Sequence, residues 1–197
     1  SSAASDVYKG QGKSKTTDVG IVHRPGFAEQ TDYAGAAAIK ILNFFEEYYG
    51  IDYPGSKLDL IAVPDFAMGA MENVGAVTFR ETLLLIDVEK ATRSELSRSI
   101  SVIAHELAHM WFGDLVTMDW WDGIWLNEAF ASLMEVIASE ATYPEFKLWN
   151  EMNQDRSRGF GVDSLKSSRP VEFEVKSPEE AEELSLIHIS EPTRRTS

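Results

Sequence analysis

Two histidines and a glutamate stand close together near the middle of the sequence, in the order His105-Glu106-Leu107-Ala108-His109. On a helix of 3.6 residues per turn, positions four apart lie about 40° apart around the axis, so both imidazoles point to one side. Two imidazoles on one helix face can bind a single zinc ion. Glu106 lies on the flank of that face, where it can activate a water molecule without being a ligand itself. The pattern predicts a catalytic zinc site.

The alternative is that the motif arose by chance, or that both histidines lie on a helix surface. Apolar residues flank the motif and indicate a buried segment: Ile103, Ala104, Leu107, Ala108, Trp111 and Phe112. Burying two imidazoles and a carboxylate costs free energy unless these groups are paired or bind a metal. We therefore favour the metal site over the chance match.

A third ligand is predicted at Glu128, which follows His109 with 18 residues between them and is expected in the first turn of the next helix. Two histidines and one glutamate leave the fourth position of a tetrahedral zinc open, as in catalytic sites. Taken alone, Glu128 is better explained as an acid stabilised by the helix dipole. Glu135 lies about 20° further around the same helix. It is a candidate partner for a ligating histidine, and an exposed helix acid is an equally good interpretation.

The elements expected around this site are short strands and longer helices. Strands are expected over residues 19–23, 58–63 and 76–79, helices over residues 31–49, 92–112, 128–141 and 144–156, a turn over residues 69–73, and a loop with an acidic run over residues 157–183. Gly50 can end the first helix. Thr92 and Glu95 fit a capping box at the start of the second, and Asn127 is expected to cap the third.

The composition excludes several classes of protein. With 44% hydrophobic residues among 197, the sequence suits one globular domain, or a large part of one, rather than a disordered chain. Its net charge of −14 repels phosphate backbones, so nucleic acid is not an expected partner. Cysteine is absent. Disulfides are therefore excluded, and any metal must be held by histidine and carboxylate groups.

The ends of the chain bear on its location. No run of about 18 consecutive apolar residues is present, so no transmembrane segment is expected. Residues 1–5 lack the basic region and apolar run of a signal peptide. The missing initiator methionine suggests that the true N-terminus lies upstream. We expect a cytoplasmic location, which suits a protein without disulfides, and an extracellular or membrane-anchored full-length form stays open.

Over residues 19–183 the sequence resembles the gluzincin aminopeptidases of the aminopeptidase N family. The resemblance rests on three motifs in this order and spacing: Gly69-Ala70-Met71-Glu72-Asn73, His105 to His109, and Asn127-Glu128-Ala129-Phe130-Ala131. It implies an α+β fold, the thermolysin-like zinc metallopeptidase catalytic domain, in which a small mixed sheet packs on a mainly helical zinc-binding part. It also implies that residues 1–25 end a preceding all-β domain and that residues 26–183 are an incomplete catalytic domain.

The resemblance implies a zinc-dependent aminopeptidase that holds one Zn²⁺ per chain and acts on peptides with a free N-terminus. His105, His109 and Glu128 would be the ligands. Glu106 would be the general base that takes a proton from water and hands it to the leaving amine. The segment from Gly69 to Asn73 would border the substrate groove, with Glu72 binding the α-amine through a charge-assisted hydrogen bond. Without the resemblance, Glu72 is equally well explained as a turn carboxylate in solvent.

Two functions other than an aminopeptidase are also compatible with the sequence. A zinc endopeptidase of the thermolysin type shares the two-histidine, one-glutamate set, but it has no use for an amine anchor, so Glu72 discriminates between the two classes. A zinc-bearing fragment without enzymatic activity is the other rival. Inactivity with zinc retained would support it.

The last residues depart from the family. Leu184 to Arg194 resembles the translation of a transposase-type sequencing adapter, so residues 184–197 are expected to be a non-native tail. In the family a tyrosine well past the zinc motif donates a hydrogen bond to the oxyanion. The corresponding position falls near Ser190, and no tyrosine follows Tyr143. Losing one oxyanion donor typically costs about a hundred- to a thousandfold in rate. We therefore expect the 197-residue chain to be nearly inactive and poorly soluble.

Overall fold

The computed structural model describes residues 7–15, 17–164 and 175 of the chain. Five strands form one mixed sheet in the order β1-β2-β3-β5-β4. They are β1 (Val7–Lys13), β2 (Asp18–Val22), β3 (Lys57–Val63), β4 (Ala70–Met71) and β5 (Ala76–Arg80). The central pairings, β2 with β3 and β3 with β5, are parallel, whereas the edge strands β1 and β4 run antiparallel to their neighbours.

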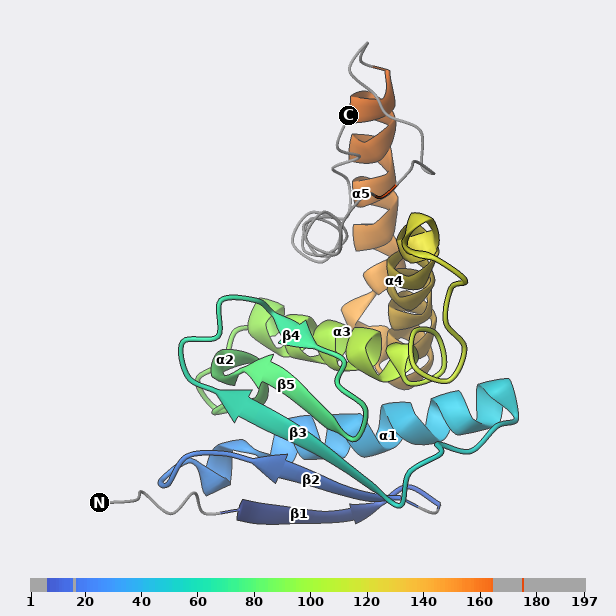
Figure 1. The fold of residues 1–197 in the computed structure, drawn as a ribbon. Helices are drawn as coiled ribbons and strands as arrows, with labels where there is room; N and C mark the ends of the chain where they lie inside the picture. The colour runs from blue at the N-terminus through green and yellow to red at the C-terminus, as the bar shows by residue number, and fades with distance from the viewer. Residues whose placement is uncertain (1–6, 16, 165–174, 176–197) are drawn as a thin grey trace.

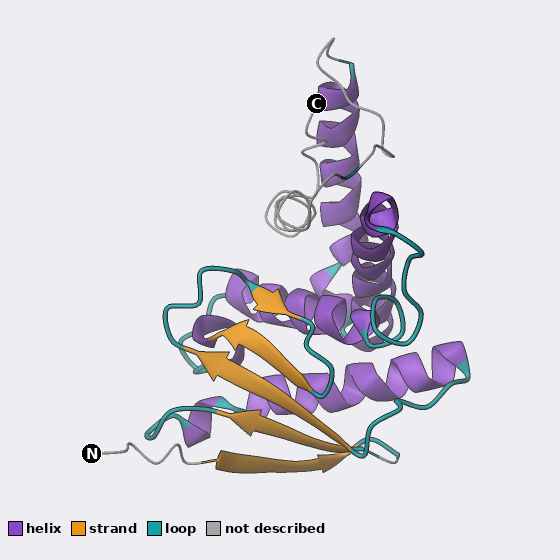
Figure 2. Ribbon diagram, in the orientation of Figure 1, coloured by secondary structure: helices purple, strands orange, loops and turns teal. Residues whose placement is uncertain are grey.

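The helices lie mainly to one side of this sheet. They are α1 (Asp32–Tyr49), α2 (Glu81–Leu84), α3 (Arg93–His109), α4 (Ile124–Thr142) and α5 (Leu148–Asp163), with short 3-10 helices η1 (Ala28–Gln30), η2 (Trp121–Gly123) and η3 (Pro144–Phe146). Figure 1 shows α4 standing beside the end of α3, and α5 projecting away from the sheet. One small mixed sheet with a larger helical part is the α+β fold that the sequence predicts (Figure 2).

The core lies between the sheet and the helices. In β3, Leu58, Leu60 and Ala62 are buried while their neighbours are more exposed, so one face of the strand packs inward. The inward face of α1 follows helical spacing, with Ala34, Ala37, Ala38, Ile41, Leu42 and Phe45 all fully buried. These two faces meet in one continuous apolar cluster, to which the last turns of α3 also belong.

Local capping signals predicted two helix ends. The Thr92 side chain accepts a hydrogen bond from the Glu95 backbone, and the Glu95 carboxylate accepts one from the Thr92 backbone, so the expected capping box is present at α3. Gly50 ends α1 with a left-handed φ of 64°, a conformation that glycine adopts without strain. The end of α3 falls at His109, before the expected residue 112.

Asn127 does not cap α4, contrary to the prediction. The helix begins at Ile124, four residues before the expected start at residue 128, and Gly123 occupies the capping position. Ile124 is buried against Met118 and Val175, so apolar packing extends the helix past the local polar signal. Glu128 consequently lies in the second turn of α4 and not in the first.

Two other expectations are also wrong. Residues 69–73 do not form only a turn, because Ala70 and Met71 pair with β5 as strand β4, and a pairing partner is not visible in local sequence. After η3, Lys147 adopts a left-handed φ of 58°, so the helix expected from residue 144 begins as α5 only at Leu148. It then continues to Asp163, past the loop expected from residue 157.

The predicted domain boundary at residue 25 falls just after β2, a strand that pairs with β3 in the same sheet. The division into domains therefore stays a prediction. The tail expected at residues 184–197 lies outside the described residues. Within the part of the chain that the structure describes, none of the helices is long and apolar enough to cross a membrane.

Candidate metal centre and catalytic site

The last two turns of α3 present the two histidines on the side that faces α4. His105 is 6% exposed and His109 is fully buried. Their Nε2 atoms lie 3.2 Å apart, because residues four apart are neighbours on a helix surface. The sequence prediction that both imidazoles point to one side is therefore confirmed in the geometry.

Glu128 approaches the same point from α4. Its Oε2 atom lies 3.3 Å from His105 Nε2 and 3.7 Å from His109 Nε2, and the residue is 1% exposed. Bonds of about 2.0–2.1 Å from a tetrahedral zinc place neighbouring ligand atoms about 3.3–3.4 Å apart. The separations of 3.2 and 3.3 Å are close to this value and that of 3.7 Å is longer, so the three donor atoms could hold a metal ion such as zinc. Below, His105, His109 and Glu128 are called the metal-ligand cluster.

A second layer of contacts orients the two rings. His105 Nδ1 lies 3.2 Å from Glu135 Oε2, so the structure brings the predicted partner, Glu135, into contact with a histidine. His109 Nδ1 lies 3.0 Å from the Phe112 carbonyl oxygen and 3.2 Å from Asn127 Oδ1. A hydrogen donated from Nδ1 leaves the Nε2 lone pair free for a metal. The contact of Asn127 with His109 was not predicted from the sequence. The position of Asn127, directly before the predicted ligand Glu128, could have indicated it.

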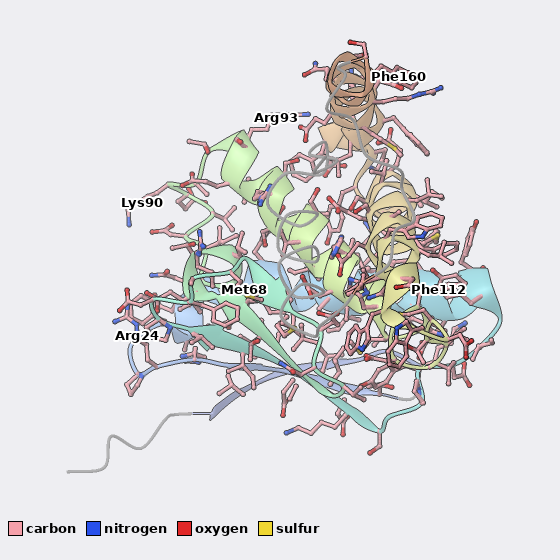
Figure 3. The ribbon with its side chains drawn as sticks, turned by 45° about the horizontal axis from the view of Figure 1, so that its top comes forward. Arg24, Met68, Lys90, Arg93, Phe112 and Phe160 are labelled. Carbon is pink, nitrogen blue, oxygen red and sulfur yellow. The ribbon has the colours of Figure 1, made fainter. Side chains whose placement is uncertain are left out.

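Gly113 makes the contact between Asn127 and His109 possible. Its φ of 131° lies in the left-handed region, and a Cβ atom there would come within 2.7 Å of Asn127 Oδ1 and 3.2 Å of His109 Nδ1. A larger residue would therefore displace the amide from the ring. Phe112, which directly precedes Gly113, lies beside the lower end of α4 in Figure 3. The centroid of the Phe112 ring lies 3.8 Å from that of the Phe130 ring.

Glu106 is the unusual group of the site. It is fully buried, and neither carboxylate oxygen has a hydrogen-bond partner among the described residues. Burial raises the pKa of Glu106 to about 8, and the nearby imidazoles only partly offset this. A buried carboxylate without a partner is costly. A proton, a water molecule or a positive charge in the site would relieve that cost.

The metal-ligand cluster is electrostatically coupled. Burial lowers the pKa of His105, but hydrogen bonds to Glu128 and Glu135 outweigh it and raise that pKa well above the usual value. The pKa of His109 is likewise raised, because its bond to Glu128 outweighs burial. The pKa of Glu128 is lowered, since its bonds to the two histidines outweigh burial. The negative charge of Glu128 therefore suits a cation at this point, whether protons or a metal.

The anchor segment, residues 69–73, lies opposite α3 on the edge strand β4. Glu72 is partly buried, directly after β4, and its charge raises the pKa of both Glu106 and His109. The structure thus brings Glu72 within electrostatic range of the metal-ligand cluster. Asp114, for which the sequence predicted no role, also lies within electrostatic range of Glu72 and His109. Burial and the charge of Glu72 raise the pKa of Asp114 to about 6.

These groups together can bind a metal ion and use a carboxylate as a base beside it. Three buried donors converge from α3 and α4, an unpartnered Glu106 lies next to them, and a second carboxylate, Glu72, follows the edge strand. That combination suits metal-assisted hydrolysis.

Comparisons with known proteins match this chain to peptidases. The Peptidase family M1 domain matches residues 33–187, a region that overlaps the first residues of the predicted tail. The "Puromycin-sensitive aminopeptidase" of Caenorhabditis elegans is 47% identical over 161 residues, which are 81% of this chain and 17% of that protein. The "Endoplasmic reticulum aminopeptidase 2" of Homo sapiens is 49% identical over 166 residues, 84% of this chain and 17% of that protein.

A plant relative, "Aminopeptidase M1" of Arabidopsis thaliana, is 45% identical over 159 residues, 81% of this chain and 18% of that protein. The chain therefore spans less than a fifth of the length of the three relatives.

Proposed function

Because the chain belongs to peptidase family M1, we propose that it carries the metal site and substrate anchor of an aminopeptidase, which hydrolyses the N-terminal bond of peptides. The observation that carries the proposal is the convergence of the metal-ligand cluster beside the unpartnered carboxylate of Glu106. The names of the relatives support the choice of an aminopeptidase over an endopeptidase.

In this proposal His105, His109 and Glu128 hold one Zn²⁺ per chain. When bound, the ion supplies Lewis acidity toward a water molecule and toward the scissile carbonyl. Glu135 and Asn127 fix the two imidazoles through their Nδ1 atoms, so that both Nε2 lone pairs stay directed at the same point. The convergence of the three donor atoms, with separations of 3.2, 3.3 and 3.7 Å, supports this assignment.

Glu106 serves as general base and then as general acid. Its place supports this role, because Glu106 is buried beside the metal-ligand cluster and neither of its oxygens has a hydrogen-bond partner among the described residues. The proton moves from water to a Glu106 oxygen, and then to the nitrogen of the leaving amine. Burial of the carboxylate excludes bulk water from competing for that proton.

Glu72 anchors the α-ammonium group of the substrate. An ammonium beside this carboxylate would form a charge-assisted hydrogen bond, and it would reduce the repulsion between Glu72 and Asp114. The rest of the anchor segment, Gly69, Ala70, Met71 and Asn73, lines the substrate next to it. Because the amine is held at one point, the bond that reaches the metal site is the first peptide bond of the substrate.

Turnover by the 197-residue chain itself is expected to be low. Large apolar side chains are exposed between α3 and the first turns of α4: Leu115, Val116, Trp120, Trp121 and Leu126. Such a surface supports the expectation of poor solubility. The position expected for the oxyanion tyrosine lies outside the described residues. The cytoplasmic location stays a prediction.

The test uses the protein extended to the length of its relatives. Glu106→Gln should lower the rate on an aminoacyl amide by at least about a hundredfold while zinc content stays near one per chain, because the amide cannot take up a proton. Glu47→Gln, which changes an exposed carboxylate on α1, is the matched control.

The substrate arm of the test distinguishes the two peptidase classes. The protein should cleave aminoacyl amides with a free amine and not their N-acetylated forms. Equal rates on both would favour an endopeptidase. Full zinc occupancy without turnover on either would favour a non-enzymatic zinc protein.

A further inference from the structure

The anchor segment is reached through a loop, residues 64–69, that contains little regular structure. The loop leaves β3 at Pro64, and Asp65 adopts a left-handed φ of 53°. Figure 3 labels Met68 within this loop. The strand that follows, β4, has only two pairs in register with β5, Ala70 with Phe79 and Met71 with Thr78. A two-residue strand on a sheet edge is held weakly by its own ladder.

The side chain of Arg80, at the end of β5, holds this loop in place. Its Nε atom donates to the Phe66 carbonyl at 3.0 Å, and its Nη2 atom donates to the Ala67 carbonyl at 2.6 Å. Its backbone N–H donates to the Gly69 carbonyl at 2.8 Å. The side chain of Arg80 thus supplies two contacts to the residues that precede β4, and its backbone supplies a third, which continues the pairing of β4 with β5.

The other end of the anchor segment has separate attachments. The Asn73 side chain donates from Nδ2 to Thr78 Oγ1 at 3.5 Å, and the Asn73 carbonyl accepts from the Ala76 N–H at 3.0 Å. Glu72 stands between these attachments and the Arg80 contacts. Its carboxylate position therefore depends on both ends of the segment.

We propose that Arg80 is a positioning residue for the substrate amine, which acts by fixing residues 66–69 and thereby the carboxylate of Glu72. The proposal rests on the proposed role of Glu72 as the amine anchor. Arg80 itself is exposed and lies on the opposite end of β4 from Glu72. It therefore affects amine binding through the backbone and not by contact.

The geometry requires arginine at this position. Two adjacent carbonyls, of Phe66 and Ala67, accept from two nitrogens of one guanidinium plane. A lysine carries a single ammonium on a flexible stem and does not reproduce this fork. Arg24 provides a matched comparison, since it is also exposed and also donates through two nitrogens, but to the Glu81 carboxylate, at 2.8 and 3.0 Å.

The test measures binding to the zinc-loaded chain, so it does not depend on turnover. Leucine hydroxamate and its N-acetylated form are titrated by calorimetry at neutral pH, and the ratio of their Kd values gives the preference for a free amine. Arg80→Met should lower this preference about five- to tenfold, less than the loss of a direct hydrogen bond to a charged group would cause, because Arg80 acts only through the loop. Arg80→Lys should fall between it and the unchanged chain, and Arg24→Met should keep the full preference.

A double variant shows whether Arg80 acts through Glu72. Glu72→Gln should remove most of the preference, and adding Arg80→Met to it should change little further. An additional loss in the double variant, or an equal weakening of both hydroxamates by Arg80→Met, would overturn the proposal. So would an unchanged preference in Arg80→Met.

The same titrations separate the two proposals. If Glu72→Gln leaves the preference intact, the amine anchor itself is wrong. If Glu72→Gln lowers it and Arg80→Met does not, only the role of Arg80 is wrong. Zinc content and thermal unfolding are measured for each variant, and should Arg80→Met unfold, Arg80→Lys decides by the same criteria.

Discussion

The metal-ligand cluster lies inside the packed interior on two long helices, whereas the anchor segment lies on a two-residue strand at the edge of the sheet. His109 and Glu128 are at most 1% exposed, and Glu72 is only partly buried. The helices that carry the cluster pack into the apolar core, and polar contacts from Glu135 and Asn127 reach the two histidines. The anchor segment is held by a few polar contacts, among them those of Arg80 and Asn73.

This difference separates two kinds of effect. A change in the metal-ligand cluster leaves a buried polar group without its partner, so it alters metal binding and folding stability together. A change at Glu72 affects a group that solvent can reach, so we expect it to alter substrate binding and to leave the fold intact. The predictions below test this separation, beginning with the largest effect.

Removing one ligand should abolish metal binding. We expect His109→Ala to lower zinc content from about one per chain to below about a tenth after dialysis, because two remaining ligands do not hold the ion. Glu72→Gln should keep full zinc content. Metal analysis of both purified variants decides the matter. Full occupancy in His109→Ala would mean that the cluster is not the metal site.

Adding a methyl group at Gly113 should weaken metal binding by the metal-ligand cluster, although Gly113 is not itself a ligand. In Gly113→Ala the new Cβ would push Asn127 away from His109, so zinc affinity should fall by about 10- to 100-fold, as for other lost contacts to a ligating histidine. Gly26→Ala is the matched control, because Gly26 also has a positive φ, of 92°, but nothing lies within 4 Å of its Cβ position. A competition titration with a chelator gives both affinities. Equal losses in the two variants would show that backbone strain alone is responsible.

The third prediction concerns the folding stability of the metal-free chain. The raised pKa of Glu106, about 8 against 4.5, means that the folded chain binds this proton more tightly than the unfolded chain. The free energy of unfolding therefore falls as pH rises through that window. Glu106→Gln has no charge to bury and avoids this loss. With chelator present, it should unfold at about the same temperature as the unchanged chain near pH 4.5 and about 10 °C higher at pH 8.5. A difference that does not vary with pH would contradict the assignment.

Local signals in the sequence predicted much of the fold and the spacing of the cluster. The capping pair Thr92 and Glu95 and the left-handed Gly50 depend on neighbours within a few residues, and the structure has both. The face shared by His105 and His109 follows from helix periodicity alone. Each of these features is decided within one or two turns of chain.

Features that depend on distant partners were missed or misplaced. Asn127 has the polarity of a cap, but packing of Ile124 moved the start of α4 and freed its amide for His109. Ala70 and Met71 form a strand only because Phe79 and Thr78 pair with them. In our proposal the position of Glu72 likewise depends on the Arg80 side chain, eight residues along the chain at the end of the neighbouring strand β5.

The three proposed metal ligands all lie between residues 105 and 128, on the helices α3 and α4, which are joined by one short connection. Closing a chain segment of that length costs little conformational entropy. Each parallel pairing of the sheet, by contrast, needs a crossover, such as the one that brings Val22 beside Ile61. In folding terms the proposed metal site is a local structure, whose assembly needs only the α3–α4 pair, and β4 also pairs locally with β5. The parallel pairing of β2 with β3 is the non-local part of the molecule, and we expect it to form more slowly.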